Sequence, residues 1–293
     1  MVPRFEAAAF TKITPNMRNA YERDGVLVLE NLIDPATCDT LRAHMETLID
    51  GFDINEHRTV FSSTSRAHDQ ENYFLDSGHD IRFFFEEEAF EPDGALKPEL
   101  PLALALNKVG HAMHDTDPVF SDFCRQPALK TVCEGLGLTS PLLLQTMYIF
   151  KQPHIGGEVV CHQDATYLRT DPQTCLGLWV ALEDATLENG CLWGIPGGQM
   201  GSQPKAIFKR KPDGNGTITE ILDDTPFDED AKVPLEVKKG SVLAFGGLFP
   251  HMSFANRSSK SRHAFTLHVI DKTADYPADN WLKRPDTLPL RGF

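Results

Sequence analysis

Six short β-prone segments follow one another in the second half of the chain, and they restrict the possible folds more than any other feature. Each segment is bounded by Gly, Pro, Asn or Asp, the residues that favour turns. Short strands in series, with no helical pattern between them, are typical of a β-sandwich or barrel. A mainly β fold is therefore expected here. The segments are 141–153, 158–168, 175–184, 190–196, 234–247 and 262–270.

The first half of the chain has helical patterns instead. Asp34-Pro35 supplies an N-cap and a first-turn proline for a helix. At 293 residues, the chain is expected to form a single domain, with flanking helices over about 1–140 and a β core over about 141–272. Helices are expected over 15–25, 35–49 and 102–115 and up to 135–137, strands over 26–29 and 81–90, and long loops over 53–72 and 200–232.

Composition narrows the class of partner. The net charge of −14 disfavours a broad surface for nucleic acid or anionic membrane, and no apolar run approaches the roughly 18 residues of a membrane helix. The N-terminus lacks the hydrophobic core of a signal peptide. The six cysteines never form Cys-x-x-Cys, so reduced thiols are expected. We therefore expect a cytoplasmic protein with a small-molecule substrate; the sequence leaves the oligomeric state open.

The stretch 159–168, VVCHQDATYL, places two ionisable side chains inside a β-prone segment. On a strand, residues two apart share a face, so His162 and Asp164 point the same way and Gln163 points the other way. A buried carboxylate needs a partner, and a divalent metal would satisfy both groups. With 11 histidines and 24 aspartates among 293 residues, about one His-x-Asp triplet is expected by chance. The triplet alone therefore establishes no site.

A third ligand of suitable type is His251, just past a later β segment. Two histidines and one carboxylate occupy one face of an octahedron and leave the other open, as in non-haem Fe(II) enzymes that activate O₂. Arg262, 11 residues further on, is placed to grip the distal carboxylate of a dicarboxylic co-substrate. Singly, such residues are usually structural, so it is their joint order and spacing that indicate function.

This order of residues resembles that of the phytanoyl-CoA dioxygenase family, and the similarity extends from about Tyr21 to Trp281. The resemblance implies a double-stranded β-helix core, which is a jelly roll of the cupin-like kind. It also implies a dioxygenase that needs Fe(II), 2-oxoglutarate and O₂, hydroxylates its substrate, and converts 2-oxoglutarate to succinate and CO₂. The segments that carry it are DGVLVLENLI, YFLDSGHDIRFFFE, NKVGHAMHDTDPVF, QTMYIFKQPHIGGEVVCHQDATYL and EDATLENGCLWGIPGG.

The resemblance also implies roles for particular residues. His162, Asp164 and His251 would be the catalytic iron ligands, and Arg262 would pair with the C5 carboxylate of 2-oxoglutarate, with Ser253 beside it. A carboxylate at position 164 favours hydroxylation or desaturation over halogenation. The remaining residues expected to line the co-substrate pocket are Lys108, Met147, Gln163 and Trp179.

Two alternative functions and one departure from the family stay open. A cupin-type dioxygenase with three histidines would need His154 or His268 as a further ligand. A sensor or pseudo-enzyme would bind 2-oxoglutarate without turnover, and neither alternative would make succinate. Where family members commonly have Ile-Pro-Gly-Ser-His, residues 195–199 of this chain are Ile-Pro-Gly-Gly-Gln. This difference leaves the iron site intact but the substrate undefined.

The longest interruption of the β pattern, at about 200–232, is polar and rich in Asp and Gly. Such a composition cannot build a core of its own. In a jelly roll the segment would overhang the open mouth, so we expect a mobile lid that contacts the substrate, with a solvated excursion as the alternative. Its basic residues are a candidate site for the phosphates of a CoA thioester, although a solvated loop explains them as well. They are Lys205, Lys209, Arg210 and Lys211.

Overall fold

The computed structural model describes residues 2–54, 57–61, 72–214 and 216–293, and most of the long loop expected over 53–72 lies outside them. The helices are α1 (Pro15–Asp24), α2 (Pro35–Asp50), α3 (Asn72–Asp76), α4 (Leu102–Ala105), α5 (Met113–Thr116), α6 (Pro118–Cys124) and α7 (Pro127–Gly135). The strands are β1 (Arg4–Glu6), β2 (Val26–Glu30), β3 (Val60–Phe61), β4 (Ile81–Glu86), β5 (Leu106–His111), β6 (Pro141–Ile149), β7 (Val159–His162), β8 (Leu176–Ala181), β9 (Leu192–Gly194), β10 (Ala206–Arg210), β11 (Thr217–Ile221), β12 (Val233–Leu235), β13 (Val242–Gly246), β14 (His251–Ser253), β15 (Ala264–Asp271) and β16 (Arg291–Gly292).

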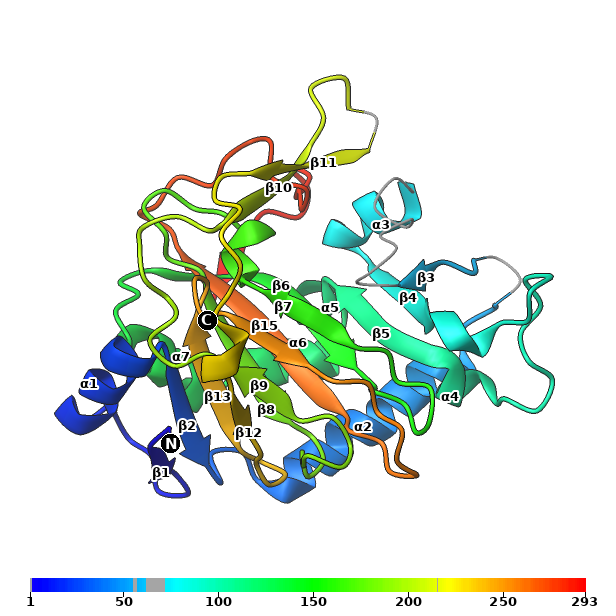
Figure 1. Cartoon of the computed structure of the whole chain (residues 1–293), viewed down its shortest axis with the longest axis horizontal. Coiled ribbons are helices and arrows are strands. Elements are labelled where there is room, and N and C mark those ends of the chain that lie inside the picture. Colours follow the sequence, from blue (N-terminus) through cyan, green and yellow to red (C-terminus); the bar gives the residue numbers. More distant parts are fainter. Residues whose placement is uncertain (1, 55–56, 62–71, 215) are drawn as a thin grey trace.

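Two β-sheets form the body of the molecule (Figure 1). The larger has ten strands in the order β1-β2-β13-β8-β15-β6-β5-β4-β3, with β16 beside β6. The smaller has the order β12-β9-β14-β7, and β10 and β11 form a separate hairpin. Neighbours in space are distant in sequence, as the pairing of β8 with β13 and β15 shows. The mainly β architecture expected for the second half is confirmed.

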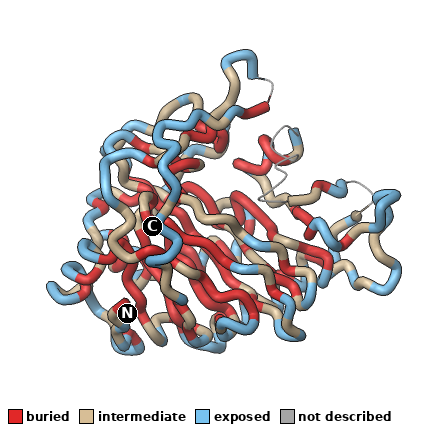
Figure 2. Tube along the Cα trace, viewed as in Figure 1, coloured by how far each residue is buried: buried red, intermediate tan, exposed pale blue. Residues whose placement is uncertain are grey.

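Alternation along the central strands separates the two faces of the larger sheet. On β15, Phe265 and Leu267 join the cluster of buried side chains that includes the helices, and the Phe265 ring stacks on Phe120 of α6 with centroids 5.2 Å apart. The residues between them, Thr266 and His268, face the interior between the sheets. Figure 2 shows the resulting buried layer with an exposed rim. One face of this sheet therefore packs against the helices in the apolar core, and the other face lines the cavity.

Helix ends follow the local sequence signals. The Asp34 side chain accepts a hydrogen bond from the Ala36 N–H and caps α2, as predicted. Gly25 ends α1 in the left-handed conformation, with φ 77°, which glycine adopts without a Cβ clash. Among the described residues, no helix is both long and apolar enough to cross a bilayer.

The helix predicted over 102–115 is wrong. Only α4 and α5 at its two ends are helical, and β5 lies between them. β5 pairs with β4 on one side and β6 on the other, so the sheet satisfies its backbone on both edges. Gly110 in its middle weakens a helix, and an added Cβ there would lie 3.3 Å from the Thr146 carbonyl oxygen. Lys108 is therefore a buried strand residue and not a solvated helical lysine.

The boundary expected near residue 140 also differs from the structure. The first half of the chain contributes β2, β4 and β5 to the larger sheet. The segment 81–90 is a strand only as far as Glu86, and a 3₁₀ turn follows over Glu87–Ala89. β2 and β4 correspond to the strands expected over 26–29 and 81–90, whereas β5 was not expected, because its sequence LNKVGH has no clear period.

The 200–232 insertion is not a patternless loop, because β10 and β11 pair within it (Figure 1). Phe208 is buried and packs with Phe74 and Trp281 from two distant segments. Lys205 and Lys209 bond to Asp223 and Glu220 of the same insertion. Arg210 donates to the carbonyl oxygens of Trp281 (2.8 Å) and Leu75 (2.8 Å). Three of the four basic residues proposed for a phosphate site thus have partners within the protein.

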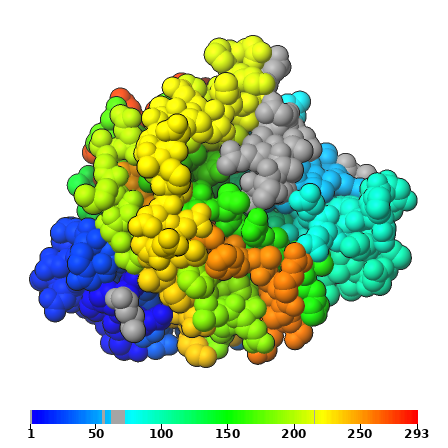
Figure 3. Space-filling model, in the orientation of Figure 1, coloured from blue at the N-terminus to red at the C-terminus, as the bar shows by residue number. Residues whose placement is uncertain are grey.

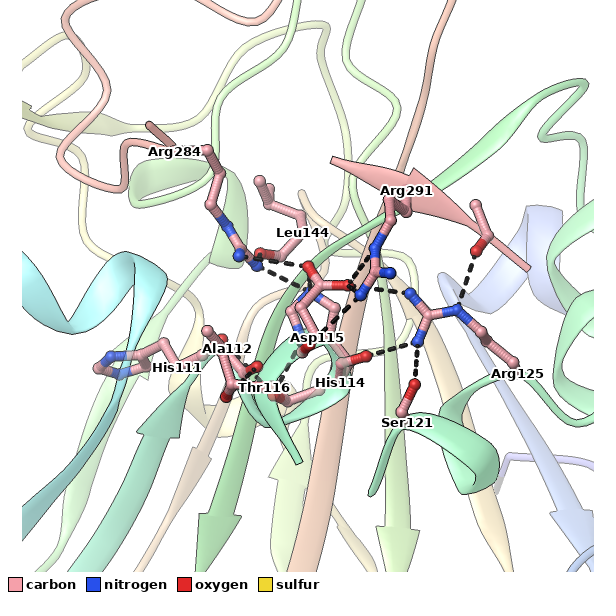
Figure 4. Close-up of polar contacts among 12 residues, drawn as sticks. His111, Ala112, His114, Asp115, Thr116, Ser121, Arg125, Leu144, Arg284 and Arg291 are labelled. Atoms are coloured by element: carbon pink, nitrogen blue, oxygen red, sulfur yellow. Dashed lines mark hydrogen bonds and ion pairs between the residues drawn. The ribbon is translucent and has the colours of Figure 1, made fainter. Parts of the chain in front are cut away.

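The buried carboxylate of Asp115, on α5, forms ion pairs with the C-terminal segment (Figure 4). Its Oδ1 accepts from Arg125 at 2.9 Å and from Arg291 at 2.7 Å, and its Oδ2 lies 3.2 Å from the Arg284 Nη1. Burial raises the pKa of Asp115, but His114 and the arginines outweigh it and hold that pKa well below its usual range. Asp115 therefore remains ionised and ties residues 284–291 to the helices.

Replacing Asp115 with Asn should lower the free energy of unfolding by about 3–5 kcal/mol, because the buried guanidinium of Arg284 would lose its counter-charge. Urea denaturation at neutral pH measures this. Because the folded pKa is depressed, the difference is full above the ordinary value of 3.8 and shrinks as the pH falls through the folded value. Glu188→Gln, in an exposed pair with Lys260, is the control and should cost no more than about 1 kcal/mol. Equal effects of the two changes would contradict the role of Asp115.

Candidate metal centre

The polar side chains of 159–168 lie where β7 ends. β7 stops at His162, Gln163 remains extended, and Asp164 begins a 3₁₀ turn. His162 and Asp164 consequently point the same way, as expected from strand geometry, although Asp164 itself is outside the strand. In the smaller sheet His251 of β14 pairs directly with His162 of β7. Antiparallel pairing thus brings together residues that are far apart in sequence.

The three side chains form a compact donor set. The His162 Nε2 lies 3.6 Å and the His251 Nε2 lies 3.8 Å from the Asp164 Oδ1. The Nδ1–H of His162 donates to the Val160 carbonyl at 2.9 Å, and that of His251 donates to the Phe249 carbonyl at 3.1 Å. These bonds fix the tautomer that leaves each Nε2 lone pair free. Among the described residues this is the group of His, Cys, Asp and Glu whose donor atoms could surround one ion, all within 4.8 Å of one another.

Burial and the charges of neighbouring groups set the protonation states of His251 and Asp164. Burial lowers the pKa of His251 to about 4, so its ring is neutral at physiological pH. Burial raises the pKa of Asp164, but the neighbouring histidines outweigh this and hold it well below its usual range. Neutral imidazoles and an ionised carboxylate are the protonation states that bind metal.

His268 holds the Asp164 carboxylate from behind. Its Nε2–H donates to the Asp164 Oδ2 at 3.0 Å, while the Oδ1 faces the other two histidines. The structure therefore places His268 against the carboxylate and outside the donor set. His154, the other histidine that a three-histidine centre would need, lies exposed elsewhere. His268 matters here because a fixed carboxylate orientation strengthens a metal site.

A cavity opens beside the donor set, between the two sheets. Arg262 lines it and is almost fully buried, and no group among the described residues bonds to its Nε or its Nη1. Burial lowers the pKa of Arg262 to about 10, so the guanidinium stays charged at neutral pH. The Ser253 hydroxyl and the Trp179 indole N–H, also on this cavity, are buried and have no partner in the described part of the chain. Buried donors that lack an acceptor are costly, so this end of the cavity fits an anionic ligand.

Three of the four other residues expected at the co-substrate pocket lie on the cavity wall, and one does not. Lys108, Met147 and Trp179 line the cavity. Lys108 also places its ammonium 3.1 Å from the centroid of the Phe61 ring. Gln163 is not among the lining residues: its amide donates to the Leu248 carbonyl at 2.7 Å and accepts from the Lys205 N–H at 2.9 Å.

The segment that departs from the family, 195–199, also lies away from the cavity lining. Gln199 donates to the carbonyl oxygens of Glu22 and Arg23 at the end of α1, at 3.2 Å each. The substitution there therefore affects contacts with α1 in this chain.

Two charged residues on the cavity wall went unnoticed in the sequence. Lys151 donates to the Gly157 carbonyl at 2.6 Å, and burial, together with Arg262, lowers its pKa to about 7. Burial raises the pKa of Glu86, whose Oε2 accepts from the Gly157 N–H at 3.1 Å. Lys151 and Glu86 are 65 positions apart, so nothing in the local sequence indicates that both bond to Gly157.

Comparison with known proteins places the chain in a family. The family model for phytanoyl-CoA dioxygenase matches residues 21–264. The chain belongs to the phytanoyl-CoA dioxygenase family. It is 42% identical to the phytanoyl-CoA dioxygenase of Arabidopsis thaliana over 93% of this chain and 94% of that protein. It is 41% identical to phytanoyl-CoA dioxygenase domain-containing protein 1 of Danio rerio, covering 92% and 94%.

The fold agrees with solved structures. The epimerase SnoN, in complex with Fe³⁺, α-ketoglutarate and nogalamycin RO, superposes with a TM-score of 0.63 at 14% identity, covering 95% of this chain and 92% of that one. The jelly roll that the resemblance implied is thus confirmed. Membership of this family makes the chain an Fe(II)- and 2-oxoglutarate-dependent oxygenase by class.

Replacing His268 with Ala should weaken Fe(II) binding about 10- to 100-fold, because the Asp164 carboxylate loses the donor that orients it. His268→Gln keeps an amide N–H and should recover most of the affinity. Anaerobic Fe(II) titration measures both. The exposed His154, with φ 66°, provides the control His154→Asn, which tolerates that backbone and should change nothing. Unchanged affinity in His268→Ala would show that the hydrogen bond does not support the centre.

Proposed function

We propose that this protein hydroxylates a small-molecule substrate with Fe(II), O₂ and 2-oxoglutarate, the last being converted to succinate and CO₂. The observation that carries the proposal is the pairing of a buried two-histidine, one-carboxylate set with the unpartnered Arg262 on the same cavity wall. A metal site with open positions suits O₂ chemistry, and a buried arginine suits the far carboxylate of a dicarboxylate. Each feature alone has structural explanations; together they fit one co-substrate.

In this proposal His162, Asp164 and His251 hold the iron, which when bound supplies O₂ activation coupled to oxidative decarboxylation of 2-oxoglutarate. Arg262 neutralises the C5 carboxylate, and Ser253 and Trp179 donate their unused O–H and N–H to the same group. Lys108 and Met147 complete the wall. The larger sheet excludes water from this end, which strengthens every charge-assisted bond. Gln163 acts indirectly, by holding the backbone at Leu248 and Lys205.

A sensor that binds 2-oxoglutarate without turnover would use the same residues. Succinate formation separates it from an oxygenase, because a binder makes none. A three-histidine, cupin-type dioxygenase also makes none, and the bond between His268 and Asp164 speaks against that class. The cytoplasmic location and the lid role of the insertion stay predictions. Phe208 gives the lid idea its support, since this residue of the insertion lines the cavity.

Asp164→Ala should abolish hydroxylation and remove most of the Fe(II) affinity, because two neutral imidazoles hold Fe(II) weakly. Anaerobic Fe(II) titration and succinate release measure the two effects. Asp224→Ala, at an exposed position of the insertion, is the matched control and should bind one iron per chain as the parent does. Full iron binding and activity in Asp164→Ala would refute the ligand assignment.

Arg262→Ala should raise the 2-oxoglutarate concentration needed for half-maximal activity on the order of 10- to 100-fold, since charge-assisted hydrogen bonds contribute roughly 1.5–3 kcal/mol. Iron affinity should barely change, which distinguishes this variant from Asp164→Ala. Arg257 is an exposed arginine in the same loop as Arg262 and pairs with Glu88. Arg257→Ala should change neither the 2-oxoglutarate requirement nor the iron affinity. Circular dichroism verifies that Arg262→Ala is folded. Equal loss of iron and 2-oxoglutarate affinity, or loss of neither, would count against the role.

A further inference from the structure

The cavity continues away from Arg262 into a region of aromatic side chains. We call this region the aromatic pocket; its members on the cavity wall are Phe61, Phe74, Tyr167, Phe208 and Trp281. Phe74 and Trp281 are stacked, with centroids 4.5 Å apart and planes 15° apart. Phe208 meets both, at 6.4 Å and 6.5 Å. None of these rings is needed for the iron or 2-oxoglutarate sites proposed above.

The aromatic pocket begins directly at the metal centre. The Tyr167 ring lies 5.9 Å from the ring of the iron ligand His162 and 5.5 Å from that of Phe208. A molecule bound among these rings would therefore be separated from His162 by about the width of the Tyr167 ring. That position is where a substrate C–H bond must lie for hydroxylation.

One polar atom of the pocket has no partner. The indole N–H of Trp281 is buried and makes no hydrogen bond among the described residues, although the ring lines the cavity. Buried Trp N–H groups normally find an acceptor. The unpaired donors of Arg262, Ser253 and Trp179 belong to the other end of the cavity, so they do not account for this one. Trp281 also lies beyond residues 21–264, the part matched by the family model.

The pocket walls are fixed by the protein itself. Arg210 of β10 donates to the carbonyl oxygen of Trp281 and to that of Leu75, next to Phe74. One side chain thus joins the hairpin, the C-terminal segment and α3. Arg284, three residues after Trp281, is paired in turn with Asp115. Walls held in this way bind rigid ligands with little ordering cost.

From these observations we infer that the primary substrate is a largely apolar, ring-bearing molecule with an oxygen acceptor for the Trp281 N–H. The aromatic rings bury its body, and the one unused donor fixes its orientation next to the iron. The hydroxylation of this molecule rests on the proposed function; its binding does not. Three of the four basic residues considered for a polyphosphate tail, Lys205, Lys209 and Arg210, bond to groups within the protein.

The test compares two probes of the same bicyclic shape, 1-tetralone with a carbonyl acceptor and tetralin without one. Each is titrated into the full chain by ligand-observed NMR, both without metal and with Mn(II) and 2-oxoglutarate. Trp281→Phe keeps an aromatic ring beside Phe74 but removes the N–H together with part of the indole ring, and tetralin measures the effect of the lost ring area. The change should therefore weaken the binding of 1-tetralone roughly 3- to 10-fold more than that of tetralin, the worth of one neutral hydrogen bond.

The other tryptophans of the chain provide matched controls. Trp179→Phe removes the unpaired N–H beside Arg262. It should weaken the binding of 2-oxoglutarate but not that of 1-tetralone. Trp193 packs on Phe254 and does not line the cavity, so Trp193→Phe should affect neither ligand.

Two results would overturn the inference. One is the absence of 1-tetralone binding to the parent protein at about 1 mM, a concentration within reach of a ligand this small. The other is a loss in Trp281→Phe that is equal for the two probes, or absent for both. Failure of iron or 2-oxoglutarate binding would instead refute the proposed function, because the metal-free titration needs neither.

Discussion

The ionised carboxylate of Asp164, buried at the point where the two sheets approach each other, is the interaction on which the site depends. An isolated charge in that position would be strongly destabilising. It is tolerated because His162 and His251 come from the smaller sheet and His268 comes from the larger one. The carboxylate thus joins the sheets through polar contacts, and a cation would complete the compensation. The same contacts fix the direction of its free oxygen.

This arrangement is possible because the two faces of the larger sheet have different roles in packing. Its outer face packs on α2, α6 and α7 in a large apolar cluster, which stabilises the strands without using their inner residues. The inner positions of β8 and β15 are consequently free to carry Trp179, Thr266 and His268. Buried donors without partners, such as those of Arg262, reduce stability. The apolar face is large enough to offset that cost, and the site keeps donors ready for a ligand.

The sequence allowed the metal ligands to be predicted because two of them sit in one short motif and the third follows a recognisable β segment. Strand alternation also placed Gln163 on the opposite side from them. β5 was missed because Leu106–His111 has no clear period, and its pairing with β4 and β6 decides its structure. His268 was considered only as an additional ligand, since the pairing of β15 that brings it behind Asp164 is not visible in the linear spacing. The walls of the aromatic pocket were not anticipated, because they come together from α3, β10 and the C-terminal segment.

The two ends of the cavity are therefore built by different kinds of contact. At the iron end, His162, His251 and His268 lie on paired strands and Asp164 follows β7 in a 3₁₀ turn, so backbone hydrogen bonds set much of their relative position. At the aromatic end, Phe74, Phe208 and Trp281 come from separate segments that meet through ring contacts and the two bonds of Arg210. The two ends are linked through Gln163, which accepts from the Lys205 N–H of the insertion, and through Tyr167, whose ring lies between those of His162 and Phe208. If the aromatic pocket takes the substrate as we infer, the C-terminal segment takes part in substrate choice and lies outside the donor set.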